Sequence, residues 1–161
     1  MNETVEKLSH VEHVLKRPDS YVGSTSLVAE EYWLLSADAS KFEKHIVRYS
    51  PALLKIFDEV LVNAIDRNSL FPKEVTSIKV DVDTSTGAIT IENNGPLGGV
   101  AVVENGKENA YNPELVFGHL LTSTNYDDSQ KRIVGGRNGY GAKLANIYSQ
   151  DFAIRVKDPV N

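Results

Sequence analysis

The sequence has no cysteine and no long apolar run. The missing cysteines exclude disulfides, thiolate zinc sites and a thiol nucleophile. A membrane-spanning helix needs about 18 or more consecutive apolar residues, and none of that length occurs. The polar N-terminal segment also lacks the apolar core of a signal peptide. We therefore expect no membrane segment and an intracellular protein, with its compartment left open by these features.

An excess of positive charge is also missing. The 161 residues contain 17 Lys and Arg against 22 Asp and Glu, a net charge of −5. A module whose main task is to grip DNA usually carries a basic face and a basic balance. We therefore expect any DNA contact by this chain to be local or indirect. The length and the ordinary apolar fraction predict a single domain over residues 1–161.

Apolar spacing and helix caps predict helices mixed with antiparallel hairpins. Ser9 and Glu12 have the spacing of a capping box, which predicts a short helix ended by Pro18. Ser50 followed by Pro51 predicts the start of the longest helix, which runs to about Asn68. Further helices are expected from a cap at Asn112 through Leu121 and from near Gly141, and strands at 32–35, 46–49, 78–82, 88–92 and 152–156. The predicted fold class is α+β.

Three polar side chains share one face of the longest predicted helix. Glu59, Asn63 and Asp66 stand at i, i+4 and i+7, which places them within roughly 60° of one another around the helix axis. Glu59 could orient and deprotonate a water, and Asn63 could offer an oxygen to Mg²⁺. A solvated polar face of an amphipathic helix explains the same spacing.

A glycine-rich segment, Gly135–Lys143, precedes another predicted helix. Its backbone N–H groups, the helix N-terminus and Lys143 could together cradle phosphate groups. Ala142 follows the last glycine where a Walker loop needs lysine, and Leu144 stands where the dinucleotide pattern needs glycine. Neither familiar motif is therefore present, and a flexible surface loop remains the alternative.

Two weaker signals come from the loops after a strand and after a helix. Asn94, at the end of a predicted strand and before Gly95, carries both a donor and an acceptor and could read an adenine edge. The hydroxyls and amide of Leu121–Asp128 could contact ribose and phosphate. A plain turn and a helix C-terminal loop are the respective alternatives. The four histidines lack metal-site spacing.

Taken together, these segments resemble the eukaryotic and large-virus type II DNA topoisomerases. The resemblance covers roughly residues 5–156, and its two most specific segments are 117–128 and 135–144, next to 16–23 and 55–66. The family shares a superfamily with gyrase, the ninety-kilodalton heat-shock chaperone, histidine kinases and MutL. It implies a Bergerat-type ATP-binding fold, a two-layer sandwich of helices on a mixed, mostly antiparallel sheet, here incomplete at its C-terminal end.

The resemblance also implies roles for individual residues. Glu59 matches the general base that activates the attacking water, and Asn63 matches the Mg²⁺ ligand. The remaining positions that match contacts to ATP are Asp66, Arg67, Asn94, Ser123, Thr124, Asn125, Asn138, Gly139, Tyr140, Gly141, Ala142 and Lys143. One segment departs from the family pattern: in Asn94–Gly99 the second glycine is displaced by one position.

The implied function is an ATPase module that binds ATP with Mg²⁺ and drives DNA strand passage. The full-length protein would be a homodimer that handles DNA through other domains, in the nucleus or in a viral or host compartment where DNA is replicated. The family's transducer and DNA-cleavage domains are absent, so we expect a fragment or a naturally short protein with weak or no activity alone. The alternative is a non-catalytic regulator that binds nucleotide or a topoisomerase partner.

Overall fold

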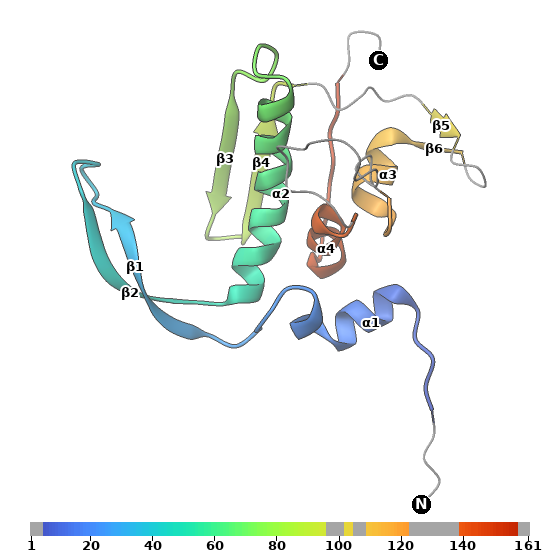
Figure 1. The fold of residues 1–161 in the computed structure, drawn as a ribbon, viewed down its shortest axis with the longest axis horizontal. Helices are drawn as coiled ribbons and strands as arrows, with labels where there is room; N and C mark the ends of the chain where they lie inside the picture. The colour runs from blue at the N-terminus through green and yellow to red at the C-terminus, as the bar shows by residue number, and fades with distance from the viewer. Residues whose placement is uncertain (1–4, 96–101, 105–108, 123–138, 158–161) are drawn as a thin grey trace, which may run out of the picture. The chain divides into compact units, whose positions relative to one another are not determined.

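The computed structural model describes residues 5–95, 102–104, 109–122 and 139–157 (Figure 1). The chain forms two compact units, Met1–Lys55 and Ile56–Asn161. Both units contain helices and antiparallel strand pairs, so the element content is α+β.

The first unit opens with helix α1 (His10–Lys16). The predicted capping box is confirmed, because the Ser9 hydroxyl accepts from the Glu12 N–H at 3.3 Å and the Glu12 carboxylate accepts from the Ser9 N–H at 2.8 Å. Pro18 then begins a single 3₁₀ turn, η1 (Pro18–Ser20), which ends the α-helix as predicted. Val14 and Val22 are buried in this unit.

The rest of the first unit is a long hairpin. Strands β1 (Val28–Leu35) and β2 (Phe42–Tyr49) pair antiparallel from Val28 opposite Tyr49 to Leu35 opposite Phe42. Both predicted strands are confirmed and extend further than expected. Toward the open end of this hairpin, the Tyr49 hydroxyl lies 2.7 Å from the Tyr32 hydroxyl and donates to Glu30 at 2.8 Å, and both interactions raise the pKa of Tyr49.

Helix α2 (Pro51–Leu70) crosses the boundary between the units. Its predicted start is confirmed, with the Ser50 hydroxyl accepting from the Leu53 N–H at 3.4 Å. It is followed by the predicted hairpin of β3 (Ile78–Asp83) and β4 (Ala88–Asn93), in register from Ile78 opposite Asn93 to Asp83 opposite Ala88. In the turn, bonds from Ser85 and Thr86 lower the pKa of Asp83 to about 2.

The second unit continues with a short strand pair that the sequence pattern did not predict, β5 (Val102–Glu104) and β6 (Asn109–Tyr111). Helices α3 (Asn112–Gly118) and α4 (Gly141–Tyr148) follow and pack against each other (Figure 1). Leu115 of α3 and Leu144 of α4 are buried.

Three local expectations were wrong. Asn112 is the first residue of α3 rather than its cap, because strand β6 runs directly into the helix and places Tyr111 at the cap position. The helix ends at Gly118, and Leu121 lies beyond it with a φ of +61°. Residues 152–157 form no strand, because alternation alone does not make one without a neighbour that completes the hydrogen-bond ladder.

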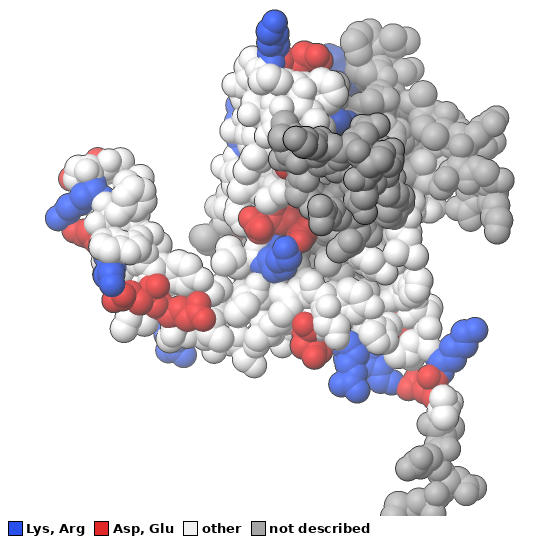
Figure 2. Space-filling view, viewed as in Figure 1, with Lys and Arg blue, Asp and Glu red and all other residues white. Residues whose placement is uncertain are grey.

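On the face shown in Figure 2, acidic and basic side chains lie next to one another, and the described part of that face carries no continuous basic patch. Among the described residues, some acidic and basic side chains form ion pairs, including Lys44 with Glu31 at 2.6 Å and Lys41 with Glu43 at 2.8 Å. The lack of a continuous basic patch on the described part of this face agrees with the net charge of −5.

Candidate functional site

The polar face of α2 carries four of the predicted site residues. Glu59, Asn63, Asp66 and Arg67 are half-buried, while Ala64 on the same helix is fully buried. The Asn63 Nδ2 donates to the Glu59 backbone carbonyl one turn earlier. Because this bond uses the carboxamide nitrogen, Asn63 presents its Oδ1 as the atom for a ligand. A hard cation such as Mg²⁺ prefers an oxygen of this kind.

The C-terminal end of α2 is held by its own contacts. The Arg67 guanidinium lies over the Phe71 ring, 5.4 Å from the ring centroid, and burial lowers the pKa of this guanidinium. Asn68 Nδ2 donates to the Val75 carbonyl at 2.7 Å, which ties the helix end to the segment that leads into β3. Arg67 therefore packs in part on Phe71, the residue that follows the end of α2.

The amino end of α4 meets Glu59. A Cβ added to Gly141 would lie 2.0 Å from Glu59 Oε2 and 3.1 Å from its carboxyl carbon, so only glycine fits without displacing the carboxylate. The preceding Gly139 has a φ of +66°, and Tyr140 occupies the cap position with no side-chain cap bond. The first N–H groups of a helix lack intrahelical partners and carry partial positive charge, which favours anions here. The structure thus brings Glu59 against the start of α4, which is the described part of the predicted phosphate cradle; residues 135–138 of that segment lie outside the described residues.

Lys143 is the one charged residue among the buried residues of the described chain. Its side chain has 6% exposure, and its Nζ donates to the Thr122 carbonyl at 2.8 Å. Burial lowers the pKa of this ammonium to about 8, so the group is still mostly protonated at neutral pH. Ala142 is buried beside it. This buried cation is carried by the third residue of α4, within the first turn of the helix.

Asn94 lies apart from these contacts. Its Oδ1 accepts from the N–H groups of Thr76 and Ser77 at 2.9 and 3.0 Å, and its Nδ2 donates to the Thr76 hydroxyl at 2.8 Å. A Cβ on the next residue, Gly95, would lie 2.0 Å from Val75 Cγ2. In this structure the Asn94 carboxamide therefore joins the end of β4 to the segment before β3. Its contact with adenine stays a prediction.

Four predicted site residues, Ser123, Thr124, Asn125 and Asn138, lie outside the described residues. One residue that the predicted set omitted is Thr122, which accepts the bond from Lys143. The sequence pattern indicated that hydroxyls in this segment contact a ligand, whereas the Thr122 hydroxyl donates to backbone carbonyls. In the local sequence, the one sign of this contact with Lys143 is that Thr122 follows shortly after Gly118, the last residue of α3.

The described ranges contain neither a ready-made metal site nor a helix that could span a membrane. Those ranges contain no group of three or more acidic or histidine side chains that could hold a metal ion. A magnesium ion typically keeps several waters and takes one or two protein ligands together with substrate phosphates, so a single oxygen from Asn63 fits this mode of binding. No helix in the described chain is long and apolar enough to span a membrane.

Comparisons with curated sequences give a consistent result. DNA topoisomerase 2 of Penicillium chrysogenum is 46% identical over 158 residues, 98% of this chain and 10% of that protein. Human DNA topoisomerase 2-alpha is 47% identical over 151 residues, 94% of this chain and 10% of that protein. The chain thus spans about a tenth of the length of the curated relatives it matches. No family model matches it.

Solved structures agree with these relatives. The ATPase region of Saccharomyces cerevisiae topoisomerase II is similar with a TM-score of 0.82 at 44% identity, covering 90% of this chain and 38% of that one. The ATPase and transducer domains of the Balamuthia mandrillaris enzyme give a TM-score of 0.82 at 46% identity, covering 91% of this chain and 36% of that one. This likeness confirms the predicted α+β fold class. Over nearly its whole length, the chain is therefore homologous to the ATPase region of DNA topoisomerase 2.

Proposed function

We propose that this chain binds ATP together with Mg²⁺ as part of the ATPase module of a type II DNA topoisomerase. The observation that carries the proposal is the contact between the Glu59 carboxylate and Gly141 at the start of α4. This contact supports the proposal because the Glu59 carboxylate, the proposed general base, lies beside a helix N-terminus, and the buried Lys143 follows two residues after Gly141. Homology to the topoisomerase II ATPase region supports the same assignment.

The chemistry follows from what each side chain can do. Glu59 accepts a proton from the water that attacks the terminal phosphate, which is the task of a general base. The N–H groups at the start of α4 and the Lys143 ammonium stabilise the negative charge of the phosphates. Asn63 would hold Mg²⁺ through its Oδ1, and the bound ion would neutralise phosphate charge.

The remaining predicted contacts divide by ligand group. Asn94 serves the adenine, Asp66 and Arg67 lie at the nucleotide-facing end of α2, and Tyr140 and Gly139 belong to the phosphate loop. Ser123, Thr124 and Asn125 contact ribose and phosphate in this proposal, and Asn138 belongs with the loop around the triphosphate. The whole protein acts as a homodimer that uses ATP to pass one DNA duplex through another, in the nucleus or in a viral or host compartment where DNA is replicated.

The test compares two isosteric changes on neighbouring residues of α2. Glu59→Gln removes the base, whereas Asp58→Asn removes the same charge from an exposed neighbour. We expect both variants to bind a non-hydrolysable ATP analogue with Mg²⁺ in calorimetric titration, and only Glu59→Gln to lose single-turnover hydrolysis. Equal turnover in Glu59→Gln and wild type would refute the role of Glu59. Binding without any wild-type turnover would instead favour a non-catalytic regulator.

A further inference from the structure

The turn after α3 has an unusual backbone that nothing in the local sequence requires. Leu121 has a φ of +61°, in the left-handed region that residues with a Cβ rarely adopt. Such a conformation costs energy and persists only where the surrounding structure holds it. The residue that follows, Thr122, makes the contacts that hold it.

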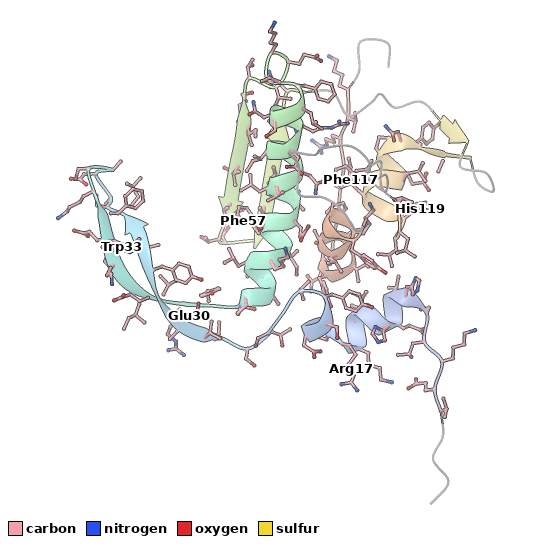
Figure 3. The ribbon with its side chains drawn as sticks, viewed as in Figure 1. Arg17, Glu30, Trp33, Phe57, Phe117 and His119 are labelled. Atoms are coloured by element: carbon pink, nitrogen blue, oxygen red, sulfur yellow. The ribbon has the colours of Figure 1, made fainter. Side chains whose placement is uncertain are left out.

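The Thr122 hydroxyl returns to the helix that precedes the turn. Its single proton is shared between the backbone carbonyls of Leu115 and His119, both within hydrogen-bond distance, the latter at 2.8 Å. The Leu115 carbonyl is one of the last four of α3, which have no partner within the helix. Figure 3 shows Phe117 and His119 at this end of the helix. The hydroxyl thus fixes the turn against α3 and sets the direction of the Thr122 carbonyl.

Two side chains of α4 then meet this end of α3. Lys143 Nζ donates to the Thr122 carbonyl at 2.8 Å, and Asn146 Nδ2 donates to the Phe117 carbonyl at 3.1 Å. Lys143 and Asn146 are three residues apart and therefore share one face of α4. The carbonyl end of a helix carries partial negative charge, so it is a favourable place for an ammonium group.

We propose that Thr122 is a positioning residue for Lys143, holding the ammonium where it meets the phosphates of a bound nucleotide. This inference rests on the proposed function, because it assumes that Lys143 binds phosphate. An ammonium group has three N–H donors. The Thr122 carbonyl takes one of them and fixes the nitrogen, and the other two are directed by that bond. Thr122 itself does not touch the nucleotide in this role.

The test uses a shape-matched pair of substitutions. Thr122→Val removes the hydroxyl while keeping a β-branched side chain, and Thr122→Ser keeps the hydroxyl. With a non-hydrolysable ATP analogue and Mg²⁺, we expect Thr122→Val to weaken binding roughly tenfold, the equivalent of one hydrogen bond, and Thr122→Ser to bind like wild type. Adenosine, which has no phosphate, is expected to bind both variants and wild type equally.

Two outcomes would overturn the proposal. One is an unchanged affinity of Thr122→Val for the ATP analogue. The other is a loss of adenosine affinity by the same factor, because that result indicates general damage to the site. In a Lys143→Met background, Thr122→Val is expected to have no further effect on binding of the analogue.

A measurement without nucleotide separates this inference from the proposed function. Urea unfolding of wild type, Thr122→Val, Lys143→Met and the double variant is expected to give non-additive losses, because Thr122→Val releases the Thr122 carbonyl from its fixed direction and Lys143→Met removes the ammonium that donates to it, the bond called the tether here. Additive losses would overturn the tether itself. A different result would be non-additive losses for Thr122 and Lys143 in a protein that binds neither the analogue nor adenosine. That result would refute the proposed function and, with it, the role of the tether in phosphate binding.

Discussion

Gly141→Ala is expected to slow ATP hydrolysis strongly while it leaves the free energy of unfolding nearly unchanged. The added Cβ would stand 2.0 Å from Glu59 Oε2. Non-bonded heavy atoms rest at about 3.5 Å, so the carboxylate oxygen has to move by roughly 1.5 Å. The atom in the way is the far end of a flexible side chain, which can rotate aside. Displacement of the carboxylate therefore costs little in folding, but it moves the proposed base out of place.

The expected magnitudes differ for the two properties. Alanine is favoured over glycine in a helix by up to about 1 kcal/mol, which offsets the lost contact and keeps the change in unfolding free energy within about 1 kcal/mol. For a chain of this size, that limits the shift in Tm to about 4 °C. A general base contributes about 10²- to 10⁴-fold, and a misplacement of 1 Å can cost about 10²-fold, so we expect the single-turnover rate constant of hydrolysis to fall by about 100-fold or more.

The assay is single-turnover hydrolysis of radiolabelled ATP, alongside thermal unfolding and titration with the non-hydrolysable analogue. Gly118→Ala is the matched control, because a Cβ there meets only Glu114 Cγ at 3.9 Å. We expect the control to hydrolyse ATP like wild type. Two results would refute the reasoning: Gly141→Ala keeps the wild-type single-turnover rate constant, or it unfolds, because the carboxylate then did not give way.

Three further predictions concern Asn63, Lys143 and Asn94. Asn63→Ala should weaken binding of the analogue roughly tenfold, about 1.4 kcal/mol, in Mg²⁺ but not in EDTA; an equal loss in both buffers would remove Asn63 from the metal site. Burial lowers the pKa of Lys143 to about 8, below that of an unfolded lysine. Between pH 8 and about 10.4 the unfolded chain therefore binds more protons than the folded chain, so the free energy of unfolding should rise across this range, by at most roughly 3 kcal/mol. Urea unfolding across this range should show the rise in wild type and not in Lys143→Met, and identical profiles would contradict the assignment. Asn94→Ala should cost about 1 kcal/mol of unfolding free energy, and Asn94→Asp, which can still accept from Thr76 and Ser77, should recover most of it; equal losses would show that these two bonds stabilise little.

Local sequence signals predicted the elements whose causes are themselves local. The capping box at Ser9 and the proline at the start of α2 each act within a few residues, and both are confirmed. The short pair β5–β6 has strands of three residues, too short for a period-two pattern to stand out. Residues 152–156 alternate but are not paired, because pairing depends on a neighbour that alternation cannot specify.

The candidate site shows the same division. Spacing along one helix was enough to place Glu59 and Asn63 on one face, and the glycine-rich pattern before α4 was enough to indicate a phosphate cradle. Only the tertiary structure decided that Gly141 lies against Glu59 and that Lys143 is buried on the Thr122 carbonyl. Such contacts join segments that are distant in the sequence, and they arise when helices bury their apolar faces against neighbouring elements. Periodicity within one helix reports which face is buried, but it carries no information about which residue of another element will meet it.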